Sequence, residues 1–393
     1  MTYLDRAHAL KNKLIAIRRD LHQHPELAFQ EVRTAQRVAD TLRELGIEYS
    51  TGIAKTGVVA YLGEGEPRIA LRADMDALPI LEANQVEYKS QNAGVMHACG
   101  HDAHVAGLLG AAMMLNEDFA TGKLKGTVKL LFQPAEENAD AQGKSGGQRM
   151  VEEGALDDVE AVVGLHVVSN LPARQVRVRP GPFMAAVDTF EAEIIGQGGH
   201  GAYPHETIDP IWLAAQIINA IHGIVSRRID PIKQGVISVT MIHAGTASNI
   251  IPGSVKLTGT IRSFEPEVRQ QLHTDLEKAL AITRVFGGDY KFTIIKGYPT
   301  TVNDPKLAEF VRVLATDLVG ADQVKEAEMQ MGAEDFSFMA RAKPGVFFNV
   351  GAKKDDVERP HHNAVFDISE EAIPTGAALL AEAARRYLIE KPR

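Results

Sequence analysis

The sequence predicts an α/β protein whose main sheet is mixed and largely parallel, with a separate α+β domain inserted into the chain. Three observations favour this architecture. The chain has 393 residues, more than a typical single core accommodates. Before residue 183 and after residue 296, short apolar runs alternate with helical patterns, as in α/β layers. Between these positions the pattern becomes strand, helix, two strands, helix and strand.

The outer segments carry the strand and helix signals of one discontinuous domain. Strands or apolar runs are expected at Val58–Leu62, Ile69–Ala73, Thr127–Phe132, Ala161–Leu165 and Gly345–Val350, and helices at Arg33–Leu45, Ala103–Leu115, Lys306–Leu318 and from about Glu370 onward. Short apolar strands that alternate with helices are typical of a largely parallel sheet. We therefore assign residues 1–182 and 297–393 to one domain.

The central segment, residues 183–296, is expected to form the inserted domain. Its elements are a strand with Phe190, Ala192 and Ile194 on one face, a helix that begins at Asp209-Pro210, strands Val236–Ile242 and Val255–Ile261, a helix Pro266–Ile282, and a strand with Tyr290, Phe292 and Ile294. The apolar stripe of the first helix is assigned to Ile211, Ala214, Ala215, Ile218, His222 and Val225. The order βαββαβ is that of a ferredoxin-like unit, and its length suffices for a small domain.

The charge, apolar runs and cysteine content of the sequence exclude several kinds of binding partner and indicate a cellular compartment. The formal net charge of −9 argues against a nucleic-acid-binding protein, which needs a basic surface to neutralise phosphates. No stretch reaches the roughly 20 apolar residues of a membrane span, and the charged N-terminus lacks the apolar run of a secretory signal. The single cysteine, Cys99, excludes an internal disulfide and fits a reducing compartment. We therefore expect a cytoplasmic protein without nucleic-acid or membrane partners.

The first chemical signal is the run from Met96 to His104, which contains one cysteine and three histidines. Two residues of a helix that are two positions apart point about 200° away from each other, so Cys99 and His101 could not share a metal within a helix. Gly100 permits a turn from which both side chains converge. A thiolate and an imidazole together suit a metal such as zinc. Taken alone, this run fits equally well a polar helix start with a buried free cysteine.

The second signal is the acidic pair Glu136-Glu137, which follows an apolar strand. One carboxylate can bind a metal while the other takes a proton from the attacking water. A solvated acidic loop would explain this pair alone. However, His166 ends another apolar strand, and a late pair, His361-His362, adds further donors. Ligands bind at the carboxyl ends of strands in open α/β sheets, so the combined pattern favours a metal centre.

Several motifs occur in order along nearly the whole chain. They are RRDLHQHPELAFQE (18–31), LRADMDALPI (71–80), the run 97–104, FQPAEE (132–137), GLHV (164–167), GQGGHGAYP (196–204), TASNIIP (246–252), GAEDF (332–336) and HHNAVFD (361–367). With these motifs the sequence resembles the M20 metallopeptidase superfamily. It is most similar to the amidohydrolase branch, which includes hippurate hydrolases, N-acyl-amino-acid deacylases and auxin-conjugate hydrolases.

The resemblance assigns roles to individual residues. It implies that the metal ligands are Cys99, His101, Glu137, His166 and His362. His362 is preferred to His361 because it stands four residues before Phe366, as the last ligand of the family does. The remaining implied roles are the general base for Glu136, a carboxylate that orients a ligand for Asp76, an oxyanion-stabilising histidine from the partner subunit for His200, and binding of the substrate carboxylate for Asn249 and Arg262.

The resemblance also implies the cofactor, the reaction and the assembly. Two divalent metal ions per subunit are expected, drawn from zinc, manganese, nickel and cobalt. The expected reaction hydrolyses the amide bond of small N-acyl amino acids, such as N-acetyl or N-benzoyl conjugates, to a carboxylic acid and a free amino acid. The inserted domain is expected to act as a lid and to pair two subunits in a homodimer, or to support a higher homo-oligomer.

Two alternatives stay open. A dipeptidase or carboxypeptidase of the same superfamily would use the same metal centre on a different substrate. A non-catalytic metal-bound sensor would use the fold without turnover, although Glu136 beside Glu137 argues against it, because a structural metal needs no spare base.

One segment departs from the family pattern. Residues Asn138–Gln148 form a longer and more polar run than the short glycine-rich one usual in this branch, which bears on substrate preference near the metals. Within this run, Gly143–Gly147 matches the G-x-S-x-G pattern of serine hydrolases, but no strand precedes the serine. A phosphate-binding loop would need glycine where Asn138 stands. Neither motif therefore indicates a site.

Overall fold

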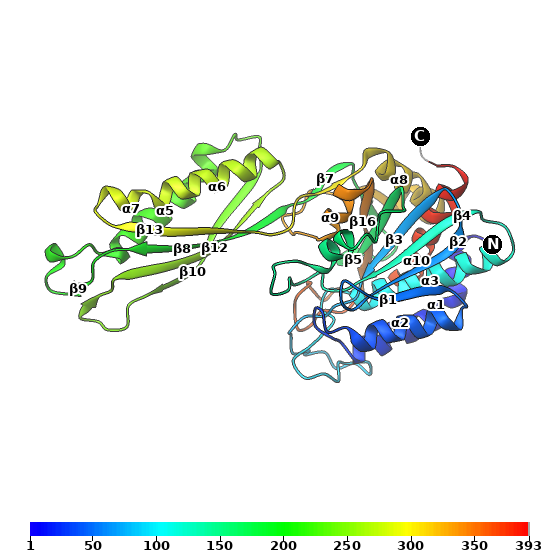
Figure 1. Ribbon diagram of the computed structural model, residues 1–393. Helices are drawn as coiled ribbons and strands as arrows, with labels where there is room; N and C mark the ends of the chain where they lie inside the picture. The colour runs from blue at the N-terminus through cyan, green and yellow to red at the C-terminus, as the bar shows by residue number, and fades with distance from the viewer. Residues whose placement is uncertain (392–393) are drawn as a thin grey trace. The chain divides into compact units, whose positions relative to one another are not determined.

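A computed structural model describes residues 1–391 of the protein (Figure 1). These residues separate into two compact units. The first unit comprises Met1–Phe183, Thr301–Glu328 and Asp335–Lys391, and the second comprises Met184–Thr300 and Met329–Glu334. The division predicted from the sequence, at 182/183 and 296/297, stays a prediction.

The first unit is built on one large mixed sheet. In spatial order its strands are β1 (Glu48–Ile53), β2 (Gly57–Glu64), β4 (Gly126–Gln133), β3 (Arg68–Asp74), β5 (Ala161–Pro172), β16 (Gly345–Lys353), β6 (Val176–Val178) and β15 (Val324–Glu326). The central strands β4, β3, β5 and β16 are parallel, whereas β1 and β2 add to the sheet antiparallel. This confirms the predicted mixed, largely parallel sheet.

Helices cover both faces of this sheet. They are α1 (Tyr3–Gln23), α2 (Val32–Glu44), α3 (His101–Ala120), α4 (Gly146–Glu152), α8 (Pro305–Val319), α9 (Phe336–Ala342) and α10 (Ala372–Ile389). Successive residues of a strand point to opposite faces. In β5, Gly164 lies against Phe336 of α9, and the next residue, Leu165, lies against Gly376 of α10. Helices α1, α3 and α10 therefore form a layer on one face, and α9 covers the other.

Three shorter elements complete the first unit: β7 (Gly181–Met184), which pairs with β14 (Thr301–Asn303), and a 3₁₀ turn at Ala321–Gln323. Helix α1 was not expected from the sequence. It begins with a capping box, in which Thr2 and Asp5 satisfy each other's backbone N–H groups. Its residues Leu14, Ile17 and Leu21 are fully buried. Strand β5 is longer than predicted, so His166 lies within the strand and not at its end.

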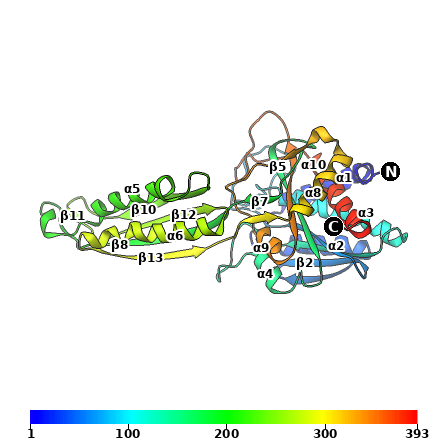
Figure 2. The ribbon, with the colours of Figure 1, turned by 90° about the horizontal axis from the view of Figure 1, so that it is seen from above.

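The second unit has the predicted βαββαβ order (Figure 2). Its elements are β8 (Ala186–Ile195), α5 (Pro210–Arg228), β10 (Gly235–Ala244), β12 (Ser254–Ser263), α6 (Pro266–Leu280), a short α7 (Ile282–Val285) and β13 (Asp289–Lys296). The four strands form an antiparallel sheet in the order β10-β12-β8-β13, and apolar residues of α5 and α6 pack on it. Two small elements, β9 (Gly199–His200) and β11 (Ile250–Ile251), pair beyond one end of this sheet, next to a 3₁₀ turn at Pro204–Glu206.

The apolar stripe predicted for α5 was only partly right: Ala214 lies in the core, Ile218 and Val225 pack at its margin, and the other three predicted residues are exposed. The residues that face the core are Leu213, Ala214, Ile217, Ile221 and Ile224. Of the predicted stripe, Ala214 alone is buried, whereas Ile211 is 49% exposed and His222 is exposed. The helix carries two overlapping apolar stripes, and periodicity alone selected the outer one. Among the described residues, no helix combines the length and apolar character needed to cross a bilayer.

Candidate metal centre

The edge where the parallel strands β3 and β4 end gathers the predicted functional residues. Strand β3 ends at Asp74 and is followed by Asp76, and β4 ends at Gln133 and is followed by the turn Pro134–Glu137. Strands β3 and β4 are paired to their last residues, Asp74 opposite Gln133, so these two segments leave the sheet side by side. This is the edge at which open α/β sheets bind ligands.

The glycine between Cys99 and His101 lets the chain turn between these two candidate ligands. Gly100 has a φ of 95°, in the left-handed region that favours glycine, and α3 begins at the next residue. A Cβ atom at this position would lie 2.5 Å from the Val167 side chain. The turn therefore requires glycine, as inferred from the spacing of the two candidate ligands.

The five predicted ligands lie in overlapping groups of donor atoms. Within each group the donor atoms lie no more than 4.8 Å apart, and the groups are Cys99 with His166 and His361, Cys99 with Glu137 and His362, and His101 with Glu136 and Glu137. Metal–ligand bonds to nitrogen, oxygen and sulfur are about 2.0–2.3 Å long, so donors at such separations can share a cation. Because Cys99 and Glu137 each belong to two groups, they connect all five predicted ligands.

The two late histidines both reach this cluster, but from different sides. Nδ1 of His361 lies 3.8 Å from Sγ of Cys99, while its Nε2 accepts a hydrogen bond from the Ser169 N–H. Nε2 of His362 lies 3.1 Å from Oε1 of Glu137. His362 has a positive φ of 58°, a strained backbone that is common at functional sites.

Asp74, His101 and His104 form a further donor group. It differs from the others because both ring nitrogens of His104 already have partners. Its Nδ1 lies 2.6 Å from Oδ1 of Asp74, and its Nε2 accepts the Val167 N–H at 2.9 Å. These contacts define a neutral imidazole that has no lone pair left for a metal. His104 therefore supports the site and does not fit the ligand set.

The carboxylate of Asp76 contacts two of the candidate ligands. Its Oδ1 lies 3.2 Å from Nδ1 of His101, and its Oδ2 accepts the Glu137 N–H at 3.0 Å. The backbone carbonyl of Asp76 also lies 2.9 Å from Nδ1 of His101. With Nδ1 engaged, Nε2 of His101 is buried and has no hydrogen-bond partner among the described residues. An unpaired buried nitrogen 4.0 Å from a carboxylate oxygen of Glu137 fits a metal ligand.

The charges around this nitrogen favour a cation. Burial would lower the pKa of His101, but the carboxylates of Asp74, Asp76 and Glu137 outweigh it and raise that pKa to about 10. Burial, together with Glu137 and Glu136, raises the pKa of the Cys99 thiol well above its ordinary value. The cluster therefore attracts positive charge, and the thiol loses its proton when a metal ion binds it.

His166 is held as a neutral donor. Burial, with the neighbouring imidazoles of His104 and His361, lowers its pKa well below the ordinary value. Its Nδ1 lies 2.7 Å from the Val167 carbonyl, so Nδ1 carries the proton and the lone pair of Nε2 faces Cys99, 3.3 Å from Sγ. An imidazole fixed in this tautomer is ready to bind a metal without losing a proton.

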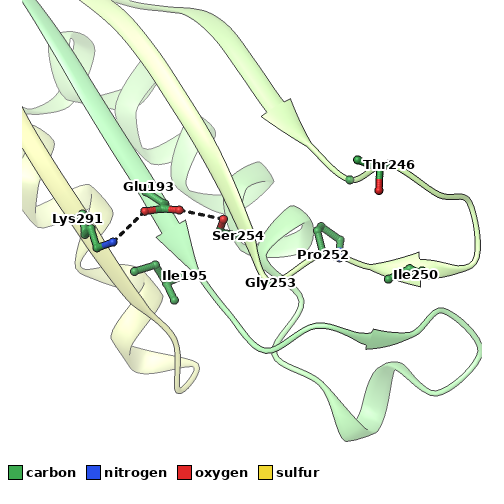
Figure 3. Close-up of a pocket in the computed structure, with 9 residues that line it drawn as sticks. Glu193, Ile195, Thr246, Ile250, Pro252, Gly253, Ser254 and Lys291 are labelled. Carbon is green, nitrogen blue, oxygen red and sulfur yellow. Dashed lines mark hydrogen bonds and ion pairs between the residues drawn. The ribbon is translucent and has the colours of Figure 1, made fainter.

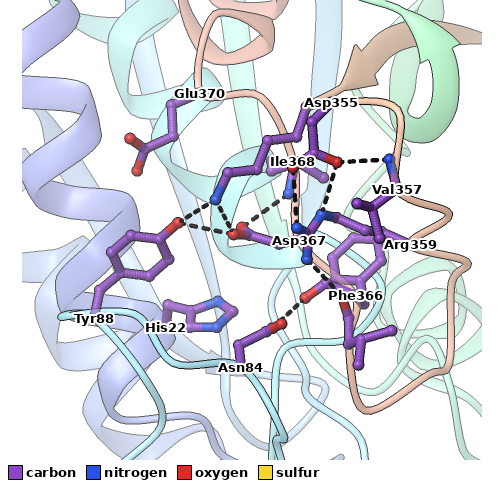
Figure 4. Close-up of polar contacts among 12 residues, drawn as sticks. His22, Asn84, Tyr88, Asp355, Val357, Arg359, Phe366, Asp367, Ile368 and Glu370 are labelled. Atoms are coloured by element: carbon purple, nitrogen blue, oxygen red, sulfur yellow. Dashed lines mark hydrogen bonds and ion pairs between the residues drawn. The ribbon is translucent and has the colours of Figure 1, made fainter.

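A buried ion network that the sequence did not reveal connects the two loops that carry ligands. Arg18 of α1 donates to Asp102, the neighbour of His101, at 2.8 Å, and to Asp367, which follows the late histidines, at 3.2 Å. Figure 4 shows that Asp367 also accepts from Tyr88 and from the Lys354 amine. Apart from the contact between Lys354 and Asp367, these contacts join residues far apart in the chain. The motif RRDLH was the available signal in the sequence, but it did not identify these partners.

Of the predicted residues in the second unit, two lie together and one lies apart. His200 in β9 pairs with Ile250 of β11, and the adjoining Asn249 carbonyl accepts the Gly201 N–H at 2.8 Å. Arg262 lies near the opposite end of β12, opposite Val187 of β8. The eight residue-to-residue steps from Ser254 to Arg262 along the strand span roughly 26 Å, so Arg262 is not part of the same cluster within this unit.

The exposed end of the second unit, here called the tip, comprises residues 199–203 and 246–251. His200 accepts the Ala202 N–H on Nδ1 at 3.1 Å, so a neutral His200 carries its proton on Nε2 and can donate it outward. A cavity of about 460 Å³ lies beside the tip (Figure 3). Its charged groups are paired with each other, because Glu193 accepts from Ser254 at 3.0 Å and from Lys291 at 3.2 Å.

The polar segment Asn138–Gln148 is anchored at its end by two glycines. A Cβ atom at Gly146 would lie 1.7 Å from the Pro134 carbonyl, and one at Gly147 would lie 2.6 Å from Asp335. The Gly147 N–H donates to Asp335 at 2.7 Å. The segment thus ends against the turn that carries Glu136 and Glu137.

With the fold and the cluster described, comparisons with known proteins identify the family. A model of peptidase family M20/M25/M40 matches residues 70–386. The chain belongs to this family. It is 42% identical to thermostable carboxypeptidase 2 of Saccharolobus solfataricus over 384 residues, 95% of each chain. It is also 42% identical to the IAA-amino acid hydrolase ILR1-like 4 of Arabidopsis thaliana, over 96% of this chain and 86% of that protein.

Among solved structures, the chain is similar to the Bacillus subtilis YXEP protein, which is described as a dinuclear metal-binding peptidase of the M20 family. The TM-score is 0.84 at 36% identity, covering 97% of this chain and 99% of that one. Membership of the family confirms the predicted resemblance and the prediction of an enzyme that hydrolyses amide bonds. The non-catalytic alternative is therefore set aside.

Proposed function

We propose that this M20 hydrolase cleaves the amide bond of N-acyl amino acids, releasing a carboxylic acid and a free amino acid. One observation carries the proposal. The adjacent residues Glu136 and Glu137 share one turn and both join a donor group with His101, but of the two it is Glu137 that also joins Cys99 and His362. One carboxylate is thus available for metal binding while its neighbour stays available for proton transfer.

The proposed ligands of two divalent ions are Cys99, His101, Glu137, His166 and His362, with zinc, manganese, nickel or cobalt as candidates. Such ions would lower the pKa of a bound water and polarise the amide carbonyl. Glu136 takes the proton from the attacking water and delivers it to the departing amine. Asp76 keeps His101 and the turn of Glu137 in place. The general base is 7% exposed, which protects its hydrogen bonds from water.

The second unit is proposed to supply substrate contacts across a homodimer. His200 would donate from Nε2 to the oxyanion of a neighbouring subunit, a contact typically worth about 3–4 kcal/mol. Asn249 and Arg262 would hold the substrate carboxylate. Support for dimerisation comes from apolar residues exposed on α5 and on the edge strand β10, including Trp212 at 48% and Ile242 at 55% exposure. Such surfaces are usually covered by a partner.

A carboxypeptidase or dipeptidase is the second candidate, because the Saccharolobus relative carries the name carboxypeptidase at equal identity. A released-amine assay separates the two activities. N-acetyl and N-benzoyl amino acids would be compared with dipeptides of the same C-terminal residue, in the presence of zinc, manganese, nickel and cobalt in turn. Preferential cleavage of dipeptides would overturn the first proposal and support the second.

A further inference from the structure

The turn Pro134–Glu137 has a strained backbone that other segments hold in place. Ala135 has a φ of 48°, in the left-handed region that is unfavourable for a residue with a Cβ atom. A turn in this conformation persists only where surrounding groups fix it. Both peptide groups of Ala135 are engaged, because its carbonyl accepts the Gly146 N–H at 2.8 Å and its N–H donates to Glu31 at 2.8 Å.

Glu31 lies at the start of α2, far from the turn in sequence, and its side chain is completely buried. One carboxylate oxygen accepts the Ala135 N–H, and the other accepts the hydroxyl of Thr56 at 2.5 Å. Thr56 lies between β1 and β2, so Glu31 joins three segments. The Ala135 N–H belongs to the peptide group between Pro134 and Ala135, one peptide before the one that leads into Glu136.

The remaining contacts of the turn show why this hydrogen bond matters. The Glu137 N–H is held by Asp76, and the Asp335 N–H lies 3.4 Å from Oε1 of Glu136. These two contacts hold Glu136 and Glu137, which follow Ala135. The hydrogen bond to Glu31 holds Ala135 itself, before both of them in the turn. Loss of the contact with Glu31 is therefore expected to let the strained residue relax and to displace Glu136 and Glu137.

We propose that Glu31 is a positioning residue for hydrolysis: by accepting the Ala135 N–H, it holds the turn that presents both Glu136 and Glu137. The inference rests on the proposed roles of these two residues. This role also explains why the Glu31 carboxylate is buried, although burial disfavours its ionised form. Burial, reinforced by the nearby Asp76 carboxylate, raises the pKa of Glu31 to about 7, so the ionised side chain reduces stability at neutral pH.

The test compares three substitutions at Glu31. Glu31→Gln keeps the length of the side chain and an oxygen that can accept the Ala135 N–H, so kcat is expected within about tenfold of wild type. Glu31→Asp keeps the charge but withdraws the carboxylate by one methylene, and Glu31→Ala removes it. Both are expected to lose about 100-fold in kcat, because misplacement by about 1 Å has effects of that size. KM should change by no more than about threefold.

Glu26→Ala is the matched control. The Glu26 carboxylate also accepts two backbone N–H groups, from Arg33 at 3.0 Å and Thr34 at 2.8 Å, at the start of the same helix. Among the described residues, its side chain makes no hydrogen bond or ion pair with the turn after β4, so this variant reports the effect of weakening the start of α2. Its kcat should stay within about threefold of wild type.

A second readout needs neither substrate nor metal. Amide hydrogen exchange in the metal-free protein should accelerate for the peptide that contains Ala135 in Glu31→Asp, but not in Glu31→Gln or Glu26→Ala. If no N-acyl amino acid is cleaved while this exchange pattern is observed, the proposed substrate fails and the positioning role stands. The role is overturned if Glu31→Asp retains wild-type exchange, if Glu31→Gln loses as much kcat as Glu31→Asp, or if Glu26→Ala matches that loss.

Discussion

The turn after β4 and the tip of the second unit both carry residues proposed to act on the substrate, but they are built differently. Glu136 is almost completely buried, and Glu31, just before α2, and Asp76, just after β3, hold its turn. His200 is exposed, and its segment is held mainly by backbone pairing with β11. The comparison suggests that proton transfer relies on a prearranged geometry, whereas oxyanion contacts are completed by a partner or substrate.

The largest expected effect tests the buried turn. Glu136→Gln keeps the volume of the side chain but removes its ability to take a proton. We expect kcat to fall by more than the roughly 10²–10⁴-fold typical of general acid–base catalysis, because the same residue serves both the water and the leaving amine. Metal content, measured by elemental analysis, should remain that of wild type.

Glu152→Gln, on the exposed side of α4, is the control for this substitution and should leave kcat unchanged. Turnover of Glu136→Gln within about tenfold of wild type would remove Glu136 from the role of base. The buried turn would then have to be explained by metal binding through Glu137 alone.

The next largest expected effect is on metal affinity and concerns Cys99, one of the candidate ligands near this turn. Cys99→Ala should weaken metal binding by more than the 10–100-fold that loss of a supporting residue typically causes. Because the pKa of the Cys99 thiol is raised, wild type must release this proton on binding, and its metal affinity should rise with pH. In the variant, the slope of log affinity against pH should decrease by about one proton.

Met96→Ala provides the comparison for lost packing, since Met96 is fully buried in the same segment. It should lower the melting temperature without changing metal affinity or its slope with pH. Equal metal affinity in Cys99→Ala and wild type, measured by competition with a chelator, would show that Cys99 is a buried thiol and not a ligand.

The tip of the second unit is tested by mixing two inactive variants, Glu136→Gln and His200→Ala. If His200 acts across a dimer, a mixed dimer contains one site with both wild-type residues. Random exchange of subunits should then restore about a quarter of wild-type activity, because half of the dimers are mixed and each has one intact site. No recovery, or a monomer by light scattering, would confine His200 to its own chain or exclude it from catalysis.

The contrast between buried and exposed regions also explains what the sequence could predict. Strand β3 was found within one residue of its expected ends, because a strand buried on both faces is a simple apolar run. The turn at Gly100, between Cys99 and His101, followed from helix geometry, although the donor atoms of these two residues belong to different groups. The stripe on α5 was misplaced because its exposed face is apolar as well, including Ile211 and Trp212.

Other parts of the site depend on contacts between distant segments, which no local pattern encodes. Helix α1 was missed because Arg18 and His22 interrupt its apolar face, although both are buried through contacts with Asp102. The roles of Glu31 at the turn and of His361 beside Cys99 were hidden for the same reason. Periodicity identifies which residues are buried with apolar neighbours, but not which polar residues are buried with each other.

The last prediction concerns the pH dependence of stability and a buried histidine, His97, in the first unit. His97 is 1% exposed, and neither ring nitrogen has a hydrogen-bond partner among the described residues. Burial lowers its pKa to about 4, from about 6.5 in an unfolded chain. Between these pH values the unfolded chain binds the extra proton and the folded protein does not, so stability falls as pH decreases from 6.5 to 4. This one group accounts for about 3 kcal/mol of that loss.

His97→Phe removes the titrating group and keeps an aromatic ring. In the metal-free protein, its free energy of unfolding in urea should therefore decrease less than that of wild type when the pH is lowered from 7 to 4. His205→Gln, at a side chain that is 73% exposed, should retain the wild-type pH dependence. If the two variants respond alike to acid, the titration of His97 does not contribute to the acid sensitivity of the folded protein, and burial does not lower its pKa.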